Sequence, residues 1–278
     1  MLDTPIVPPI PSTSSTPVPQ ATSTLPAPAD ASERSESGIS NAQLNKKNHR
    51  DTWPRGNYRN YYTFRPASSA PDGAVNPASA DALDGRLALL DPSLFSGKTL
   101  LDLGTNAGKI PLDALLHCGA KSSTGVDIDP LLIEDAQALA NERGFEQDDH
   151  RCRFLAGDFM QEGWFPATFG TTRFDVVTLF SVTKWLHLWN GDDGMLQLFR
   201  SLHSFLPPGG VVVVEPQEWD NYKRAVKKNK DLRETFKAIK MRPPFEEEMR
   251  AVGFTLEERI EREEGGFSRP LLVWRKES

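Results

Sequence analysis

A short strand–turn–helix pattern constrains this chain more than any other feature. Residues 99–103 form an apolar run that predicts a buried strand, and a helical pattern begins at Ile110. Between them, Asp102, Gly104 and Gly108 are spaced as Asp-x-Gly-x-x-x-Gly. Glycine in such a turn lets a ligand approach the backbone, and the helix that follows presents free N–H groups. The pattern predicts either an ordinary strand–turn–helix or a ligand-binding turn.

The acids near this turn narrow the choice of ligand. The spacing is not the Gly-x-Gly-x-x-Gly of dinucleotide-binding proteins. An acid two residues before the first glycine suits a cation better than a pyrophosphate, and S-adenosylmethionine (SAM) carries an ammonium group. Asp127 lies at the carboxyl end of the next predicted strand, about 20 residues beyond the turn, where a nucleoside ribose is usually bound. We therefore predict that Asp127 holds the adenosine hydroxyls, whereas Asp129 before Pro130 fits a helix N-cap.

Strands and helices alternate over most of the chain. Strands are predicted at 99–103, 123–129, 152–156, 174–180 and 211–214, helices at 110–117, 131–143 and 194–205, and a closing pair of strands at 254–259 and 271–274. This order predicts an α/β fold with a seven-stranded, Rossmann-like sheet, parallel in its core, with right-handed crossovers. Ligands bind such sheets at the carboxyl ends of the strands.

Composition limits the domains and the function classes. Residues 1–44 are rich in Pro, Ser, Thr and Ala, which predicts a disordered tail before a single domain at 45–278. The net charge of −6 argues against a generic binder of polyanions, so any nucleic-acid contact needs local basic patches. The two cysteines form no zinc-binding array, so we expect no metal. We also expect no signal peptide and no membrane span.

Two segments carry ambiguous nucleic-acid signals. Residues 55–66 interleave aromatic side chains with Arg and Asn, as stacking on bases and pairing with phosphates would require. A linker that packs its rings on a domain surface has the same composition, and composition alone favours that interpretation. Residues 223–242 are strongly basic. Such a run is typical of a solvated helix face, but it is also compatible with binding to RNA phosphates.

The segment after the fourth strand bears on the methyl acceptor. Residues 180–188 lack the Asn/Asp-Pro-Pro-aromatic pattern common in methylation of amino groups, and instead place Lys184 and His187 beside a Trp at the rim. Cations suit an anionic acceptor. A terminal phosphate, with a second pKa of about 6, needs neutralisation and positioning rather than a general base. Lys184 and His187 can supply both, with Arg65 and a Tyr closing the site; alternatively they are an exposed Lys and a structural His.

Taken together, residues 55–276 resemble the bicoid-interacting-protein-type RNA methyltransferases, a family that includes methylphosphate capping enzymes. The resemblance rests on the turn and on seven further motifs: Gly56-Asn57-Tyr58-x-x-Tyr61-Tyr62-x-Phe64-Arg65, Asp84-Gly85-Arg86-Leu87, Asp127-Ile128-Asp129, Ser181-x-Thr183-Lys184-Trp185-x-His187-Leu188, Gly191-Asp192-Asp193-Gly194, Pro208-Gly209-Gly210 and Glu215-Pro216-Gln217-x-Trp219.

The resemblance implies a class I SAM-dependent methyltransferase that acts on the 5′ phosphate of a small non-coding RNA. Capping enzymes act on the γ-phosphate and stay bound to their product, whereas a sister branch methylates 5′ monophosphates. The implied location is nuclear or nucleo-cytoplasmic, and ribonucleoprotein proteins are candidate partners. The alternative from a different class is an RNA-binding scaffold of a small ribonucleoprotein in which catalysis is dispensable.

The resemblance also implies site residues. With Asp102 and Gly108 of the turn, cofactor contacts fall on Tyr62, Arg86, Gly104, Thr105, Asn106, Asp127, Ile128, Asp158, Phe159 and Phe180. Substrate contacts fall on Asn57, Tyr58, Tyr61, Arg65, Lys184 and His187, of which the last four form the catalytic group. The chain departs from the family by reading Trp189-Asn190 where Asn-Trp is usual, and Asp158-Phe159 where the capping enzyme has Asn-Tyr.

Overall fold

The computed structural model describes residues 55, 61, 82–146, 149–261 and 269–277. Within them, one sheet has the strand order β3-β2-β1-β4-β5-β7-β6. Its strands are β1 (Thr99–Leu103), β2 (Ser122–Asp127), β3 (Cys152–Ala156), β4 (Val176–Phe180), β5 (Val211–Glu215), β6 (Phe254–Ile260) and β7 (Leu271–Lys276). Strands β1 to β5 are parallel, and β7 is antiparallel to both β5 and β6. The predicted seven-stranded α/β fold is confirmed.

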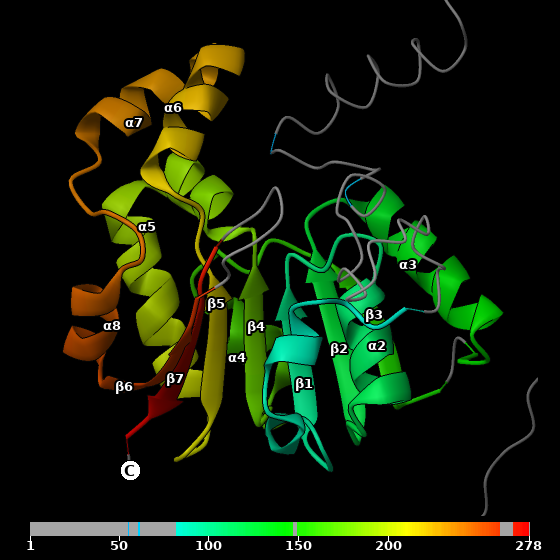
Figure 1. Cartoon of the computed structure of the whole chain (residues 1–278). Coiled ribbons are helices and arrows are strands. Elements are labelled where there is room, and N and C mark those ends of the chain that lie inside the picture. Colours follow the sequence, from blue (N-terminus) through cyan, green and yellow to red (C-terminus); the bar gives the residue numbers. More distant parts are fainter. Residues whose placement is uncertain (1–54, 56–60, 62–81, 147–148, 262–268, 278) are drawn as a thin grey trace, which may run out of the picture. The chain divides into compact units, whose positions relative to one another are not determined.

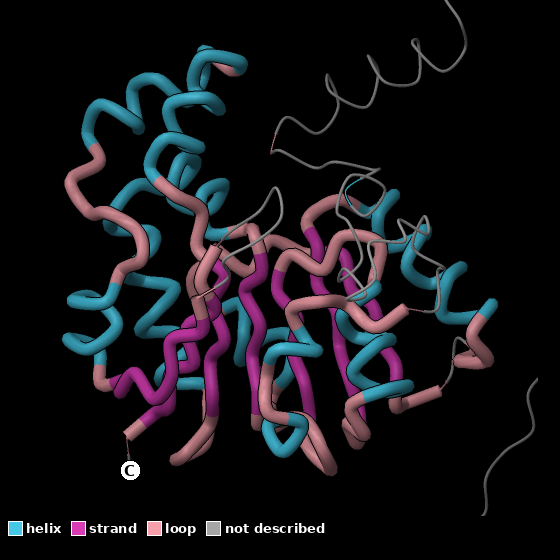
Figure 2. The backbone as a smooth tube through the Cα atoms, viewed as in Figure 1, coloured by secondary structure: helices cyan, strands magenta, loops and turns pink. Residues whose placement is uncertain are grey.

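Helices cover both faces of the sheet (Figures 1 and 2). They are α2 (Lys109–His117), α3 (Pro130–Glu142), α4 (Trp164–Phe169), α5 (Thr183–Phe205), α6 (Trp219–Lys228), α7 (Arg233–Ala238) and α8 (Glu246–Val252), with short 3-10 turns at Leu87–Leu89, Pro92–Leu94 and Lys230–Leu232. Side chains alternate along each strand, so Leu101 and Leu103 pack with α4, α5 and α8, whereas Leu100 packs on the opposite face with α2. The hydrophobic core therefore consists of two layers separated by the sheet.

Helix α5 is longer than the sequence predicts. A helix was expected only from Gly194, but α5 begins at Thr183 and continues through a kink at Gly191, where φ is 68°. Gln217 stabilises its start, because its Oε1 accepts hydrogen bonds from Thr183 Oγ1 at 3.1 Å and from the Lys184 N–H at 2.9 Å. The apolar period is weak before the kink, because several side chains there face a cavity instead of the core.

Helices α6 and α7 lie beyond the carboxyl ends of the parallel strands, on the β5 side of the sheet (Figure 1). A small cluster joins them to the first part of α5, with buried Leu188, Tyr222, Ala225, Leu232 and Ile239 at its centre.

The predicted N-cap of α3 is confirmed, because Asp129 Oδ1 accepts the Leu131 N–H at 3.0 Å. Within the described ranges, no helix is long and apolar enough to cross a membrane, and no group of His, Cys, Asp and Glu is arranged to hold a metal ion.

Candidate active site

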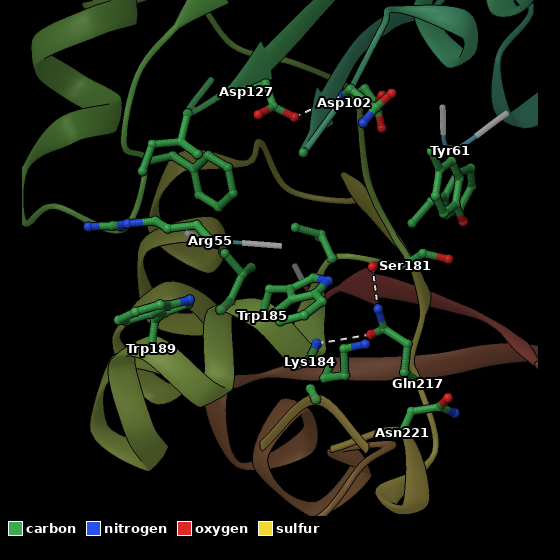
Figure 3. Close-up of a pocket in the computed structure, with 18 of the residues that line it drawn as sticks. Arg55, Tyr61, Asp102, Asp127, Ser181, Lys184, Trp185, Trp189, Gln217 and Asn221 are labelled. Carbon is green, nitrogen blue, oxygen red and sulfur yellow. Dashed lines mark hydrogen bonds between the residues drawn. The ribbon is translucent and has the colours of Figure 1, made fainter. Parts of the chain in front are cut away.

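A cavity of about 400 Å³ opens at the carboxyl ends of the central strands, between the turn after β1 and α6 (Figure 3). Ligands of α/β sheets bind at this edge, since the loops that follow the parallel strands meet there. Many of the predicted site residues line the cavity: Tyr61, Arg86, Asp102, Gly104, Asn106, Asp127, Ile128, Asp158, Phe159, Phe180 and Lys184. The topology thus brings together residues that are more than a hundred positions apart.

The turn after β1 has the geometry that its glycines suggest. Gly104 and Gly108 have φ of 81° and 79°, in the left-handed region that glycine adopts most readily. A Cβ on Gly104 would lie 2.6 Å from Val182 Cγ2, and one on Gly108 would lie 2.8 Å from Ala136 Cβ. Thr105 is 1% exposed, and neither Thr105 nor Gly108 lines the cavity. These two predicted cofactor contacts instead belong to the packing behind the turn.

Two buried carboxylates face the cavity from β1 and β2. Asp102 Oδ1 accepts a hydrogen bond from Thr178 Oγ1 at 2.6 Å, and burial raises the pKa of Asp102 to about 6. Asp127 accepts the N–H groups of Asn106 at 2.9 Å and Asp129 at 3.1 Å, and burial raises its pKa to about 6 as well. Both acids are mostly ionised at pH 7. An ionised carboxylate can bind an ammonium group or ribose hydroxyls, and these roles of Asp102 and Asp127 stay predictions.

The wall beyond Asp127 is partly apolar and is closed by an ion pair. Ile128 and Phe159 supply apolar surface, as a nucleobase pocket requires. Asp158, predicted to meet the adenine amino group, accepts the Met160 N–H at 3.2 Å and has its Oδ2 3.1 Å from Arg55 Nη1. Arg55, a cavity residue outside the predicted set, therefore occupies one oxygen of this carboxylate.

The opposite end of the cavity is cationic. Lys184, Arg224, Lys228 and Arg269 all line it. The pKa of Lys184 falls to about 8, because burial and then the charges of Arg269, Lys228 and Arg224 disfavour its ammonium form. Its Nζ lies 4.2 Å from the centroid of the Trp185 ring, which partly compensates the lost hydration. Four cationic side chains that line one end of a cavity fit an anionic ligand.

A buried network supports this cationic end. Ser181 has a φ of 59° and donates its hydroxyl proton to Glu215 Oε2. Arg269 Nη1 donates to Ser181 Oγ at 2.9 Å, and Gln217 Nε2 donates to the carbonyl oxygen of Ser181. Arg86, which is 1% exposed, places its Nη1 3.5 Å from Glu215 Oε2. The unusual backbone at Ser181 is therefore held from several sides, and it links the cofactor end of the cavity to the cationic end.

His187 does not occupy the rim position predicted from the sequence. It is 0% exposed and does not line the cavity. Its Nε2 lies 2.7 Å from Asp192 Oδ1 and its Nδ1 3.3 Å from the Tyr222 hydroxyl. Asp192 Oδ2 in turn accepts the Lys240 N–H at 2.8 Å. The helical continuation of α5 turns His187 away from the face that carries Lys184, so His187 ties α5 to α6 and to the segment before α8.

Several cavity residues were missed as site residues by sequence reasoning. They are Arg55, Trp189, Gln217, Asn221, Arg224, Lys228 and Arg269. The basic run contained Arg224 and Lys228, but Arg269 has no local signal because only the position of β7 brings it to the site. Of the exchanged pair, Trp189 lines the cavity, while Asn190 Nδ2 donates to the Leu186 carbonyl at 2.8 Å. The predicted substrate and cofactor contacts Asn57, Tyr58, Tyr62 and Arg65 lie outside the described residues.

Comparison with known proteins agrees with this geometry. The family model described as Bicoid-interacting protein 3 (Bin3) matches residues 174–276, and a methyltransferase-domain model matches residues 101–212. The U6 snRNA methylphosphate capping enzyme Amus of Drosophila melanogaster is 34% identical over 238 residues, which cover 80% of this chain and 74% of that protein. A probable RNA methyltransferase of Arabidopsis thaliana is 29% identical over 276 residues, covering 83% of each chain.

Solved structures agree in fold. The N-methyltransferase NodS of Bradyrhizobium japonicum has a TM-score of 0.50 and 18% identity, covering 69% of this chain and 93% of that one. This likeness concerns the architecture alone. With the family matches, it confirms the predicted methyltransferase fold.

Proposed function

The chain belongs to the Bicoid-interacting protein 3 family, and on that premise we propose that it is a SAM-dependent methyltransferase of the 5′ phosphate of a small RNA. One observation carries the proposal. A single cavity holds two buried carboxylates, Asp102 and Asp127, at one end and four cationic side chains at the other. The first end suits a cofactor that carries an ammonium group and a ribose, and the second suits a polyanionic acceptor.

The described residues fit the cofactor. Asp102 would hold the ammonium group of SAM, and Asp127 would accept hydrogen bonds from the ribose hydroxyls. Gly104 leaves no side chain in the space beside Val182, so the cofactor can lie close to the backbone there. Ile128 and Phe159 supply apolar surface for the adenine ring. The cavity volume of about 400 Å³ also falls in the range typical of small-molecule sites.

The cationic end neutralises and positions the phosphate that accepts the methyl group. When bound, SAM supplies a methyl group on a sulfonium sulfur; a phosphate oxygen takes this group while the sulfur keeps the electron pair of the broken bond. A terminal phosphate is largely ionised at pH 7, so no residue needs to remove a proton. Lys184, Arg224 and Arg269 instead neutralise the phosphate and hold its oxygen in line with the methyl group.

The number of cations favours a 5′ triphosphate over a monophosphate. Four positive side chains around one ligand match the charge of a triphosphate better than the charge of about −2 on a monophosphate. The proposal extends to a small nuclear RNA and a nuclear location, because the Drosophila relative is named for U6 snRNA.

Methyl transfer from labelled SAM to purified RNA tests the proposal. RNA with a 5′ triphosphate should be labelled, the same RNA with a 5′ hydroxyl should not, and a 5′ monophosphate should react more slowly. Absence of label on every RNA would overturn the proposal. A Lys184→Ala protein that transfers no methyl group but sustains normal RNA levels in cells would favour the scaffold function.

A further inference from the structure

Helix α6 carries more positive charge than the cavity uses. Its ten residues include four cations, Lys223, Arg224, Lys227 and Lys228, and one acid, Asp220. Only Arg224 and Lys228 line the cavity, whereas Lys223 and Lys227 are exposed and do not. The net charge of the whole chain is −6, so this concentration of cations does not follow from the composition.

The cations form one continuous surface around the helix. At 3.6 residues per turn, the order Lys223, Lys227, Arg224, Lys228 covers a sector of about 140°, from the solvent side to the cavity side. Tyr222 and Ala225 lie outside this sector and pack against α5. A polyanion bound at Arg224 and Lys228 would meet Lys227 and Lys223 next as it leaves the cavity.

Local interactions do not account for all of these cations. Lysine in the last turn of a helix interacts favourably with the helix dipole, which explains Lys227 and Lys228 but not Lys223 and Arg224. Lys223 Nζ lies 2.9 Å from Asp220 Oδ1, but these side chains are 54% and 66% exposed, and such pairs contribute little. Lys227 makes no ion pair with any residue that the structure describes.

We propose that Lys223 and Lys227 bind the phosphodiester backbone of the RNA that follows its 5′ end, so that α6 guides the RNA out of the cavity. This inference rests on the proposed function, because the 5′ phosphate sets the point from which the strand departs. Lysine provides a point charge for phosphate without reading sequence, so the expected contribution is to affinity and not to base preference.

The test compares two 5′-triphosphate RNAs, a dinucleotide and an RNA of about 20 nucleotides with a single-stranded 5′ end. Their affinities for the full chain are measured over a series of salt concentrations. For the long RNA, the K223A/K227A variant should lower the slope of log affinity against log salt by about 1.4, which is 0.7 for each lost contact with a single strand. The affinity for the long RNA should fall more than that for the dinucleotide.

A matched control removes two exposed lysines at the amino ends of the strands, on the side of the sheet away from the cavity. Lys98 and Lys121 precede β1 and β2, and the Lys121 N–H donates to the Lys98 carbonyl at 2.8 Å. K98A/K121A makes the same change in net charge and should leave the slope as in the wild type. The proposal is overturned if both variants give the wild-type slope, if both lower it equally, or if K223A/K227A weakens both RNAs equally.

Failure of the proposed function is a separate result. A wild-type protein that transfers no methyl group to either RNA would overturn the methyltransferase proposal. A slope that depends on Lys223 and Lys227 in that same protein would still support RNA binding along α6.

Discussion

Gln217 Oε1 accepts the backbone N–H of Lys184 at 2.9 Å, and Gln217 Nε2 donates to the carbonyl oxygen of Ser181. One side chain on the loop after β5 therefore holds both the start of α5 and the loop before it. Lys184 is the first, in sequence order, of the four cations at the cationic end of the cavity. Its position depends on a residue 33 positions further along the sequence.

Replacing Gln217 should thus impair positioning as well as stability. Gln217→Ala leaves the Lys184 N–H and the Ser181 carbonyl unpaired, and each such loss in a buried region costs about 1–3 kcal/mol. We expect a lower free energy of unfolding in denaturant titrations and at least a tenfold lower kcat for methyl transfer. Gln197→Ala, at an exposed position on α5, is the control and should change stability by less than about 0.5 kcal/mol. Wild-type kcat in Gln217→Ala would contradict the positioning role.

Because the pKa of Lys184 is reduced, we expect the pH profile of methyl transfer to have a descending alkaline limb. Because its pKa is about 8 in the free protein, raising the pH through that value removes a positive charge from the phosphate site. We expect kcat/KM for RNA to fall above about pH 8, since this parameter reports ionisations of the free enzyme. Lys184→Arg keeps the charge at higher pH and should remove this limb, even if its maximal rate is lower. An alkaline limb of the same position in both proteins would exclude Lys184 as its origin.

We expect the ionised Asp102 side chain to destabilise the folded chain but to strengthen cofactor binding. Burial raises its pKa to about 6, so the ionised form is less favourable in the folded chain than in the unfolded chain. Above pH 6 this carboxylate therefore destabilises the protein without cofactor, and Asp102→Asn should raise the melting temperature at pH 8. The same variant should bind SAM at least tenfold more weakly by calorimetry. The wild type should lose SAM affinity as the pH falls through about 6, since protonation removes the charge opposite the ammonium group.

The glycine turn offers a comparison between two alanine substitutions. Gly104 and Gly97 have φ of 81° and 70°, but a Cβ on Gly104 would lie 2.6 Å from Val182 whereas one on Gly97 meets nothing within 4 Å. Both Gly→Ala changes carry the strain of a left-handed backbone, about 1 kcal/mol. Gly104→Ala adds overpacking of about 1–3 kcal/mol and should also weaken SAM binding. Equal destabilisation of the two variants in thermal unfolding would show that the contact with Val182 relaxes freely.

Local patterns in the sequence determined the strands, the α/β class of the sheet and the carboxylates at one end of the cavity. The apolar run at 99–103, the glycine turn and Asp127 are close in sequence, and a parallel sheet places the ends of neighbouring strands together. For this reason, the sequence alone could predict that the acids at the ends of β1 and β2 lie close together. Lys184 could also be identified, because its motif follows directly after a strand.

Only the tertiary structure decided the composition of the cationic end. Arg269 reaches it because β7 inserts beside β5, and Arg224 and Lys228 reach it because α6 packs on α5 above the sheet. The same packing turns His187 away from the cavity, although the sequence placed it beside Lys184. A residue's neighbours along the chain show which chemistry it can perform. Whether its side chain faces a ligand depends on helix phase and on long-range packing, which a single sequence does not encode locally.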